Sequence, residues 1–237
     1  MAIGQQSRFW WRAMRARLRD ERAELSAART CIGPSALVCD IGAFKGSYLF
    51  WLSRWAARVV AFEPQPDLAD NLKRLAAPNV TIETKGVSST SGKLGFHVPD
   101  GAPAGGSLRP VEGNHRQFAI DVVALDDYFP PGERLAFIKI DVEGAELEVF
   151  RGAERILTEQ APALLFECEA RHHASGDVRP VFSHLAALGY RGEFVWRGRL
   201  HPLARFDPAV HQRSDGARFW DAPDYCNNFL FRRPGAG

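Results

Sequence analysis

The stretch that decides the fold is "ALVCDIGAFKGSYLFWLSRWAARVVAFEP", which runs from Ala36 to Pro64. Its first part, "ALVCDIG", is a short apolar run typical of a buried strand. "SYLFWLSRWAA" places apolar residues at helical spacing, and "RVVAFEP" is a second strand closed by proline. A strand, a helix and a second strand at this rhythm predict a right-handed βαβ unit, and therefore a parallel sheet.

The same rhythm continues along the chain with one interruption. "NVTIETKGVSS" predicts a third strand, "LAFIKID" and "APALLFECEA" predict two more, and "GEFVW" and "CNNFLFRR" are late strands. Between residues 91 and 125, "KLGFHVP" and "FAIDVVAL" predict two antiparallel strands joined by a loop rich in glycine and proline. We therefore expect residues 32–237 to form one α/β domain with a β insertion at 91–125.

The first 31 residues carry a basic segment, "RFWWRAMRARLRDERAEL". Helical spacing brings Trp10, Met14, Leu18 and Leu25 to one face, and arginines surround the rest. The segment predicts a helix that docks on the domain through this face. A lid over the site, or a docking element for an acidic partner, are the alternatives.

The composition is that of a soluble globular protein. The chain has 237 residues, 46% of them hydrophobic and 24% charged. A net charge of +2 gives no strong field for nucleic acid or for a membrane surface, and no apolar run is long enough to span a membrane. The four cysteines show no metal-binding spacing, so we expect reduced thiols and a cytoplasmic protein. A homodimer is compatible with these totals.

The turn "DIGAFKG" places Asp40, Gly42 and Gly46 between a strand and a helix. Glycines let a ligand approach the backbone, and a helix start offers free N–H groups. The spacing is not G-x-G-x-x-G and the acid precedes the glycines. This pattern suits a cationic ligand better than a dinucleotide pyrophosphate, which argues against a nicotinamide dehydrogenase. Close packing of strand and helix is the alternative explanation.

Glu63 ends the second strand, 23 residues after Asp40. From this position a carboxylate can reach the two ribose hydroxyls of a bound nucleoside. As an isolated acid before a proline, it would instead be a solvated turn residue. Together with the glycine turn, Glu63 predicts a nucleoside-bearing cofactor.

Two acids, Asp141 and Glu143, end a later strand in "FIKIDVEGAELEVF". In an open parallel sheet, ligands bind beyond the carboxyl ends of the strands, close to the point where the strand order reverses. These acids are therefore candidates for a site. The alternative is that they only favour the start of the following helix.

The next strand ends in the same way, in "LLFECEARHH". Two neighbouring strand ends that both carry acids predict a convergent polar site. A histidine among carboxylates could act as a general base, although a tandem pair at a loop start is often only solvated. The residues concerned are Glu167, Glu169, His172 and His173.

The blocks "VCDIGAFKG", "VVAFEPQPDLADNL" and "VVALDDYFPPGERLAFIKIDVEGAELEVFRGAERIL", followed by "PALLFECE", are similar to the FkbM family of methyltransferases that depend on S-adenosylmethionine (SAM). The similarity runs from about Leu37 to Glu169 and does not include the basic N-terminal segment. It implies a Rossmann-like, seven-stranded, mostly parallel sheet with helices on both faces, the class I methyltransferase fold, with the last strand antiparallel. It also implies methyl transfer to a hydroxyl of a small molecule such as a sugar or polyketide.

Carried over to this chain, the resemblance implies three groups of cofactor contacts and a reaction site. Glu63 would hold the ribose, while Asp141 and Glu143 would face the transferred methyl and the acceptor. Glu167 and His172 are further catalytic candidates. The methionine end would be lined by Asp40, Gly42, Ala43 and Gly46, and the adenine by Gly86 and Val87.

This chain departs from the family where an asparagine usually follows "DIGA", because Phe44 and then Lys45 stand there. The substitution would remove a hydrogen bond at the helix start and add positive charge near a sulfonium.

Two alternative functions remain open from the sequence, besides the dehydrogenase that the glycine spacing argues against. A nucleic-acid methyltransferase would hold phosphates with the N-terminal arginines, and a non-catalytic protein could use the same fold for interaction. We expect a small-molecule acceptor rather than nucleic acid. Mg²⁺ could bind Asp141 with Glu167 or Glu169, but the resemblance does not require it, and we predict no metal ligands.

Overall fold

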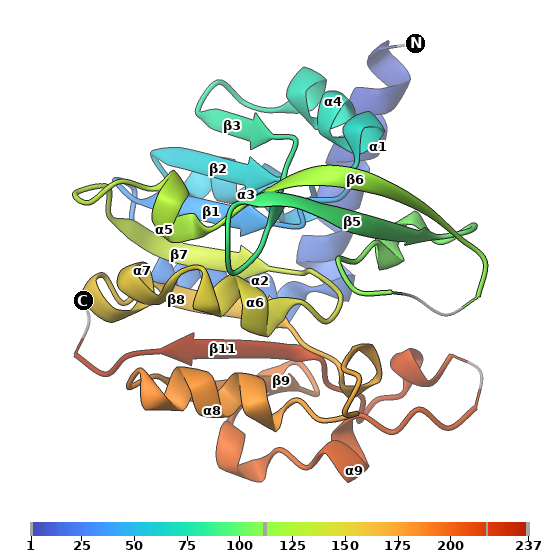
Figure 1. The fold of residues 1–237 in the computed structure, drawn as a ribbon, viewed down its shortest axis with the longest axis vertical. Coiled ribbons are helices and arrows are strands. Elements are labelled where there is room, and N and C mark those ends of the chain that lie inside the picture. Colours follow the sequence, from blue (N-terminus) through green and yellow to red (C-terminus); the bar gives the residue numbers. More distant parts are fainter. Residues whose placement is uncertain (1, 111–112, 217, 236–237) are drawn as a thin grey trace.

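The computed structural model describes residues 2–110, 113–216 and 218–235, and its main feature is an eight-stranded sheet (Figure 1). The strand order is β10-β9-β11-β8-β7-β1-β2-β3. The five strands from β3 to β8 are parallel, and β11 is antiparallel to both of its neighbours. This confirms the predicted Rossmann-like class. The strands are β1 (Leu37–Ile41), β2 (Arg58–Phe62), β3 (Val80–Glu83), β7 (Leu135–Ile140), β8 (Ala163–Glu167), β9 (Arg191–Trp196), β10 (Arg199–Pro202) and β11 (Asn228–Arg232).

The sheet has eight strands where seven were expected, because β9 folds back on itself as a hairpin. Arg197 and Gly198 join β9 to β10, with φ angles of 50° and 73°. Two consecutive residues with positive φ are typical of a two-residue hairpin turn, whose twist matches that of the strands. The extra strand lies at the edge of the sheet, far in the strand order from β1.

Helices cover both faces of the sheet (Figure 1). Successive side chains of a strand point to opposite faces, so each strand contributes to a hydrophobic core on both faces of the sheet. Val38 packs with the helices of one face, and its neighbour Cys39 packs with those of the other. On the Val38 side lie α1 (Ala2–Arg15), α2 (Arg22–Cys31), α3 (Ser47–Trp55) and α4 (Pro66–Leu75). On the Cys39 side lie α5 (Leu125–Tyr128), α6 (Glu146–Arg151), α7 (Glu154–Glu159) and α8 (Arg179–Ala187). The short α9 (Pro208–His211) follows β10.

A second, three-stranded sheet contains the insertion. It consists of β4 (Gly86–Val87), β5 (Gly92–Pro99) and β6 (His115–Val123) in the order β4-β6-β5. The antiparallel pairing of β5 with β6 confirms the prediction. The predicted third strand was too long, however. It ends at Glu83, and the chain then crosses to the small sheet, where β4 pairs with β6.

Residues 2–31 form the N-terminal arm, which packs on the Val38 face of the sheet. The expected single helix is broken by a π-helical turn at Ala16–Asp20, after which Glu21 leaves helical geometry with φ −131°. The predicted buried face was wrong in part, because α1 packs through Phe9 and Ala13, one residue round the helix from Trp10, and the π turn then shifts the register of the residues that follow. Trp10 is 52% exposed and Leu18 is 73% exposed. The buried residues of the arm are Phe9, Ala13, Ala16, Leu25, Ala27 and Ala28.

The topology brings four strand ends to one edge. From β1 the chain continues to β2 on one side of it, and β7 pairs with β1 on its other side. The strand order therefore reverses between β1 and β7. Ile41 pairs with both Phe62 and Ile140, and Ile140 pairs with Phe166. The residues after these positions therefore meet at the switch point, where ligands bind in such sheets.

Among the helices of the described ranges, none combines the length and the apolar character needed to cross a membrane.

Candidate active site

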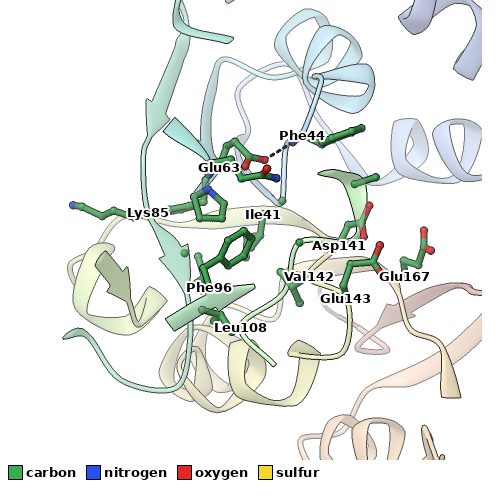
Figure 2. Close-up of a pocket in the computed structure, with 18 residues that line it drawn as sticks. Ile41, Phe44, Glu63, Lys85, Phe96, Leu108, Asp141, Val142, Glu143 and Glu167 are labelled. Atoms are coloured by element: carbon green, nitrogen blue, oxygen red, sulfur yellow. Dashed lines mark hydrogen bonds between the residues drawn. The ribbon is translucent and has the colours of Figure 1, made fainter. Parts of the chain in front are cut away.

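Two adjoining cavities lie at the switch point. The larger cavity has a volume of about 260 Å³ and the smaller cavity about 120 Å³. Both are lined by Gly42, Phe44, Asp141 and Glu167, so they meet at the turn after β1 and at the ends of β7 and β8. Figure 2 shows the larger cavity, with carboxylates on one side and Phe96 and Leu108 on another.

The glycine turn holds the ends of β1 and β7 together. Gly42 has φ 76°, and a Cβ built on it would lie 1.8 Å from the carbonyl oxygen of Asp141. No side chain fits in this space. The predicted residue Ala43 lines only the smaller cavity.

Gly46 has a different role from the one predicted, because it lines neither cavity. It precedes α3 with φ 79°, and a Cβ there would lie 2.6 Å from the Phe9 ring of the N-terminal arm. The missing side chain is needed for close packing of the arm against α3.

Glu63 lies where a ribose carboxylate is expected. Its side chain is 2% exposed and lines the larger cavity. One oxygen accepts a hydrogen bond from the Phe44 amide at 2.8 Å (Figure 2), and the other accepts from the Gln65 amide at 2.9 Å. Burial raises the pKa of Glu63 to about 7 although these two bonds oppose the shift. Each oxygen retains a second lone pair, so the carboxylate is held in place and can still accept from a diol.

Phe44 carries the turn where the family usually has asparagine. Its φ of 47° is in the left-handed region, which asparagine tolerates better than phenylalanine does. The amide of Phe44 bonds Glu63, and its ring lines both cavities with the ammonium of Lys45 4.6 Å from the ring centre. The bond to Glu63 fixes the turn without a side-chain cap.

The apolar side of the larger cavity comes largely from the insertion. Phe96 of β5, Leu108 and Val142 line it beside the predicted residues Gly86 and Val87. Sequence reasoning missed Phe96 and Leu108. The alternation of "KLGFHVP" puts Phe96 on the apolar face of β5, but only the fold shows that this face reaches the edge of the main sheet.

The other side is acidic, with Asp141, Glu143 and Glu167 (Figure 2). The Asp141 carboxylate lies 3.1 Å from the ammonium of Lys139, which is 5% exposed. Lys139 was also missed from the sequence, although a lysine two residues before Asp141 on a buried strand shares its face. The pair neutralises one charge of this acidic side.

Glu143 and His172 face each other from neighbouring strand ends. His172 Nδ1 lies 2.7 Å from the Glu143 carboxylate, and Glu143 has φ 51°, an unusual value for this residue type. Burial raises the pKa of Glu143 and the His172 contact opposes it. For His172, burial lowers the pKa, but the bond to Glu143 outweighs burial and the pKa is raised. Glu143 lines the larger cavity and His172 stands behind it.

The insertion also fixes the Glu143 turn. The Ser107 hydroxyl donates to the carbonyl of Glu143 at 2.7 Å, and Arg109 donates to the carbonyl of Gly144 at 2.5 Å. A Cβ on Gly144 would lie 2.4 Å from the carbonyl oxygen of His172, so the turns after β7 and β8 touch. These contacts hold an unfavourable backbone conformation at a candidate site, as strained functional turns are held elsewhere.

The remaining candidates are engaged in different ways. Burial raises the pKa of Glu169, but hydrogen bonds from Arg171 and Tyr225 outweigh it and lower the pKa to about 2. Burial, first of all, and three neighbouring acids raise the pKa of Glu167 well above its usual value. His173 points away from the cavities, because its Nε2 lies 3.3 Å from the sulfur of Cys168.

The Mg²⁺ site at Asp141, which the sequence left open as an alternative, is not among the groups of potential ligand atoms in the described residues. Within the described ranges, the side chains with potential ligand atoms close together are Glu143 with Glu169 and His172, and Glu146 with Cys168 and His173. Asp141 is paired with Lys139, and Glu169 is bonded by Arg171.

These buried acids predict that the ligand-free protein loses stability as the pH rises. Burial raises the pKa of Asp40 to about 6, and the pKa of Glu63 and of Glu21 to about 7. An acid whose folded pKa is raised binds more protons in the folded state, so stability falls between its unfolded pKa near 4 and its folded pKa. His172 acts in the same direction, because its raised pKa stabilises only the charged form.

We expect the melting temperature to fall by on the order of 10 °C between pH 5 and pH 8, as a combined loss of roughly 5 kcal/mol from the three acids implies. Thermal unfolding monitored by circular dichroism measures it. Glu169 does not interfere, because its pKa near 2 places its effect below pH 5. A melting temperature that rises over this range would contradict the assignment.

Comparison with known proteins identifies similar sequences. The family described as the methyltransferase FkbM domain matches residues 40–191. The hexuronic acid methyltransferase AglP of Haloferax volcanii is 32% identical over 149 residues, which are 60% of this chain and 61% of AglP. The methyltransferase sdnD of Sordaria araneosa is 30% identical over 155 residues, 49% of this chain and 60% of sdnD. The aligned region thus spans about three fifths of the length of these two relatives.

Two further comparisons extend over more of the chain. The 2-O-methyltransferase NoeI of Sinorhizobium fredii is 25% identical over 194 residues, 69% of this chain and 80% of NoeI. The crystal structure of a methyltransferase FkbM from Methylobacillus flagellatus superposes with a TM-score of 0.52 at 17% identity, covering 96% of this chain and 54% of that one. At this identity the superposition shows a shared fold.

Proposed function

The chain belongs to the methyltransferase FkbM family, and on that premise we propose that it transfers a methyl group from SAM to a hydroxyl of a small, sugar-like molecule. The observation that carries the proposal is the larger cavity at the switch point. It joins an apolar side, a fixed carboxylate at the ribose position and an acidic side with Asp141 and Glu143. A nucleoside sulfonium requires these three features in one site.

The side chains present fit SAM. Glu63 would hold the ribose hydroxyls, and Phe96, Leu108 and Val142 would pack against the adenine. Gly42 leaves the backbone open at the junction of the two cavities. Asp40 lines the smaller cavity with both carboxylate oxygens buried and, within the described residues, without a hydrogen-bond partner. A buried acid in this state favours a cation beside it.

SAM supplies an electrophilic methyl group on a sulfonium. The protein must then align an acceptor oxygen with that methyl and remove the hydroxyl proton as the new C–O bond forms and the C–S bond breaks. Glu143 is the residue we assign as the base, because it lines the cavity and is held by His172. The acidic side also complements the positive charge of the sulfonium.

The acceptor class comes from the relatives. One is named for a hexuronic acid and another for 2-O-methylation, so a carbohydrate hydroxyl is the acceptor that we propose. The insertion at 91–125 and the N-terminal arm border the cavities and would shape the acceptor pocket. We propose that residues 1–31 act as an arm on a methyltransferase domain of residues 32–237.

Transfer of a labelled methyl group tests the proposal. The protein is incubated with SAM labelled in the methyl group and with separate panels of glycosides and of RNA. We expect label in the glycosides and none in RNA. Label in RNA would favour a nucleic-acid methyltransferase, and tight SAM binding without transfer to any acceptor would favour a non-catalytic protein.

Glu63→Ala should weaken the binding of S-adenosylhomocysteine by roughly 1.5–3 kcal/mol, since it removes charge-assisted hydrogen bonds to the ribose. Isothermal titration calorimetry measures the change. Glu83→Gln is the matched control, because Glu83 ends the neighbouring strand β3, bonds Tyr128 and lies outside the larger cavity. If folded wild-type protein bound neither SAM nor S-adenosylhomocysteine, the cofactor assignment would be wrong.

A further inference from the structure

The N-terminal arm delivers an acid to the smaller cavity. Glu21 stands at the corner between the π-helical turn and α2, where the backbone leaves helical geometry. Its side chain lines the cavity with Asp40, Tyr48 and Lys139. One of its carboxylate oxygens is buried and, in the described part of the chain, lacks a hydrogen-bond partner. The break in the arm thus points an acid at the glycine turn.

The charges around the smaller cavity do not balance. Asp141 is paired with Lys139 at 3.1 Å, and burial beside neighbouring acids raises the pKa of Glu167 well above its usual value. Asp40 is 1% exposed, and both of its oxygens lack partners among the described residues. Asp40 and Glu21 therefore remain as two acids that Lys139 alone does not satisfy, which is the environment that attracts a cation.

The two cavities are lined in common by Gly42, Phe44 and Asp141, so one ligand can extend from the larger into the smaller. On the basis of the proposed function, we infer that Glu21 binds the amino-acid end of the cofactor and, together with Asp40, takes its primary ammonium group. Lys45 and Ser47 line the same cavity. Their ammonium and hydroxyl groups are hydrogen-bond donors for the carboxylate of that amino acid. Glu21 lies outside the matched range 40–191, so this contact belongs to the arm.

The neighbours of Glu21 support this role. Burial raises the pKa of Glu21 to about 7, Lys139 opposes the shift, Glu24 and Asp141 add to it, and the Tyr48 hydroxyl bonds the carboxylate. A bound ammonium would favour the charged form of this carboxylate. Phe9 of the arm packs on Gly46, which anchors the arm beside the turn. The arm therefore forms one side of the smaller cavity and is held there by packing.

The variant Glu21→Gln tests the inference, since it keeps the size of the side chain and its contact with Tyr48 but removes the charge. Binding is measured by calorimetry in buffer containing EDTA with three ligands. These are S-adenosylhomocysteine, its deaminated analogue, and 5′-methylthioadenosine, which lacks the whole amino acid. Asp20→Asn is the matched control, because Asp20 precedes Glu21 in the arm, pairs with Arg15 at 2.6 Å and lines neither cavity.

We expect Glu21→Gln to weaken S-adenosylhomocysteine binding about 10- to 100-fold, as loss of a charged hydrogen bond implies. Binding of the deaminated analogue and of 5′-methylthioadenosine should change less than about twofold, and Asp20→Asn should leave all three unchanged. If Glu21→Gln fails to fold, Tyr48→Phe tests the same point, because it releases the Glu21 carboxylate and should weaken S-adenosylhomocysteine alone.

Equal losses for all three ligands would show a structural role and overturn the inference, and so would unchanged binding of S-adenosylhomocysteine. Wild-type protein that binds none of the three would overturn the proposed function itself, and the inference with it. The two failures are thus distinguishable.

Discussion

Glu143→Gln should lower kcat by on the order of 10²- to 10⁴-fold while S-adenosylhomocysteine binding stays within a few fold of wild type, since loss of a general base costs this much in rate. Glutamine keeps the size of the side chain but cannot take up the proton of the substrate hydroxyl. The backbone of the turn is held by Ser107 and Arg109, whose bonds go to main-chain carbonyls and survive the substitution. Turnover of labelled methyl groups and a melting curve separate chemistry from folding.

His172 gives this prediction a second readout. The base must be ionised, so kcat of the wild type should rise with pH through the raised pKa of Glu143. Burial raises the pKa of Glu143, and the contact with His172 lowers it. His172→Asn should therefore raise the pKa of Glu143 further and move the acid limb of the pH profile to higher pH. A Glu143→Gln enzyme with near-normal turnover and a lowered melting temperature would show that Glu143 only supports the turn.

Asp141→Asn is the less selective variant. We expect it to lower turnover too, because Asp141 lines both cavities. It would also leave the buried ammonium of Lys139 without its partner at 3.1 Å, and an unpaired buried charge destabilises a fold strongly. Stability and chemistry would therefore change together, which is why the role of the acids is tested better at Glu143.

Gly42→Ala should destabilise the protein by on the order of 3–5 kcal/mol and abolish measurable cofactor binding, because overpacking and a forced left-handed backbone act together. The new Cβ would lie 1.8 Å from the carbonyl oxygen of Asp141, so the ends of β1 and β7 must separate. Thermal unfolding should show a melting temperature lower by roughly 10 °C, and calorimetry with S-adenosylhomocysteine should show no heat of binding.

Gly101→Ala is the control that isolates backbone strain. Gly101 has φ 75°, nearly the value at Gly42, but a Cβ there has nothing within 4 Å. Its substitution should therefore cost about 1 kcal/mol, the ordinary penalty of a left-handed residue. Equal effects of the two substitutions would mean that the contact between the β1 and β7 turns does not hold the site together.

Local patterns in the sequence predicted the parallel sheet, the antiparallel insertion strands and the acids at the strand ends. A buried parallel strand must be a short apolar run, and the residue after it must lie at the sheet edge, so the positions of Glu63 and Asp141 follow from the chain itself. The resemblance to a family then assigned roles to those positions. None of this requires knowledge of contacts between distant segments.

Tertiary structure decided which of the candidates meet. Glu21 carries no local signal, and the sequence patterns around Phe96 and Lys139 show a strand face but not that this face reaches the cavities. His172 and His173 are neighbours in sequence, yet one faces Glu143 and the other Cys168, because successive residues of a turn point in different directions. The raised pKa of Glu167 likewise depends on burial and on acids that follow two different strands, β7 and β8. Side-chain direction, burial and charge coupling are properties of packed distant segments, and a linear pattern does not contain them.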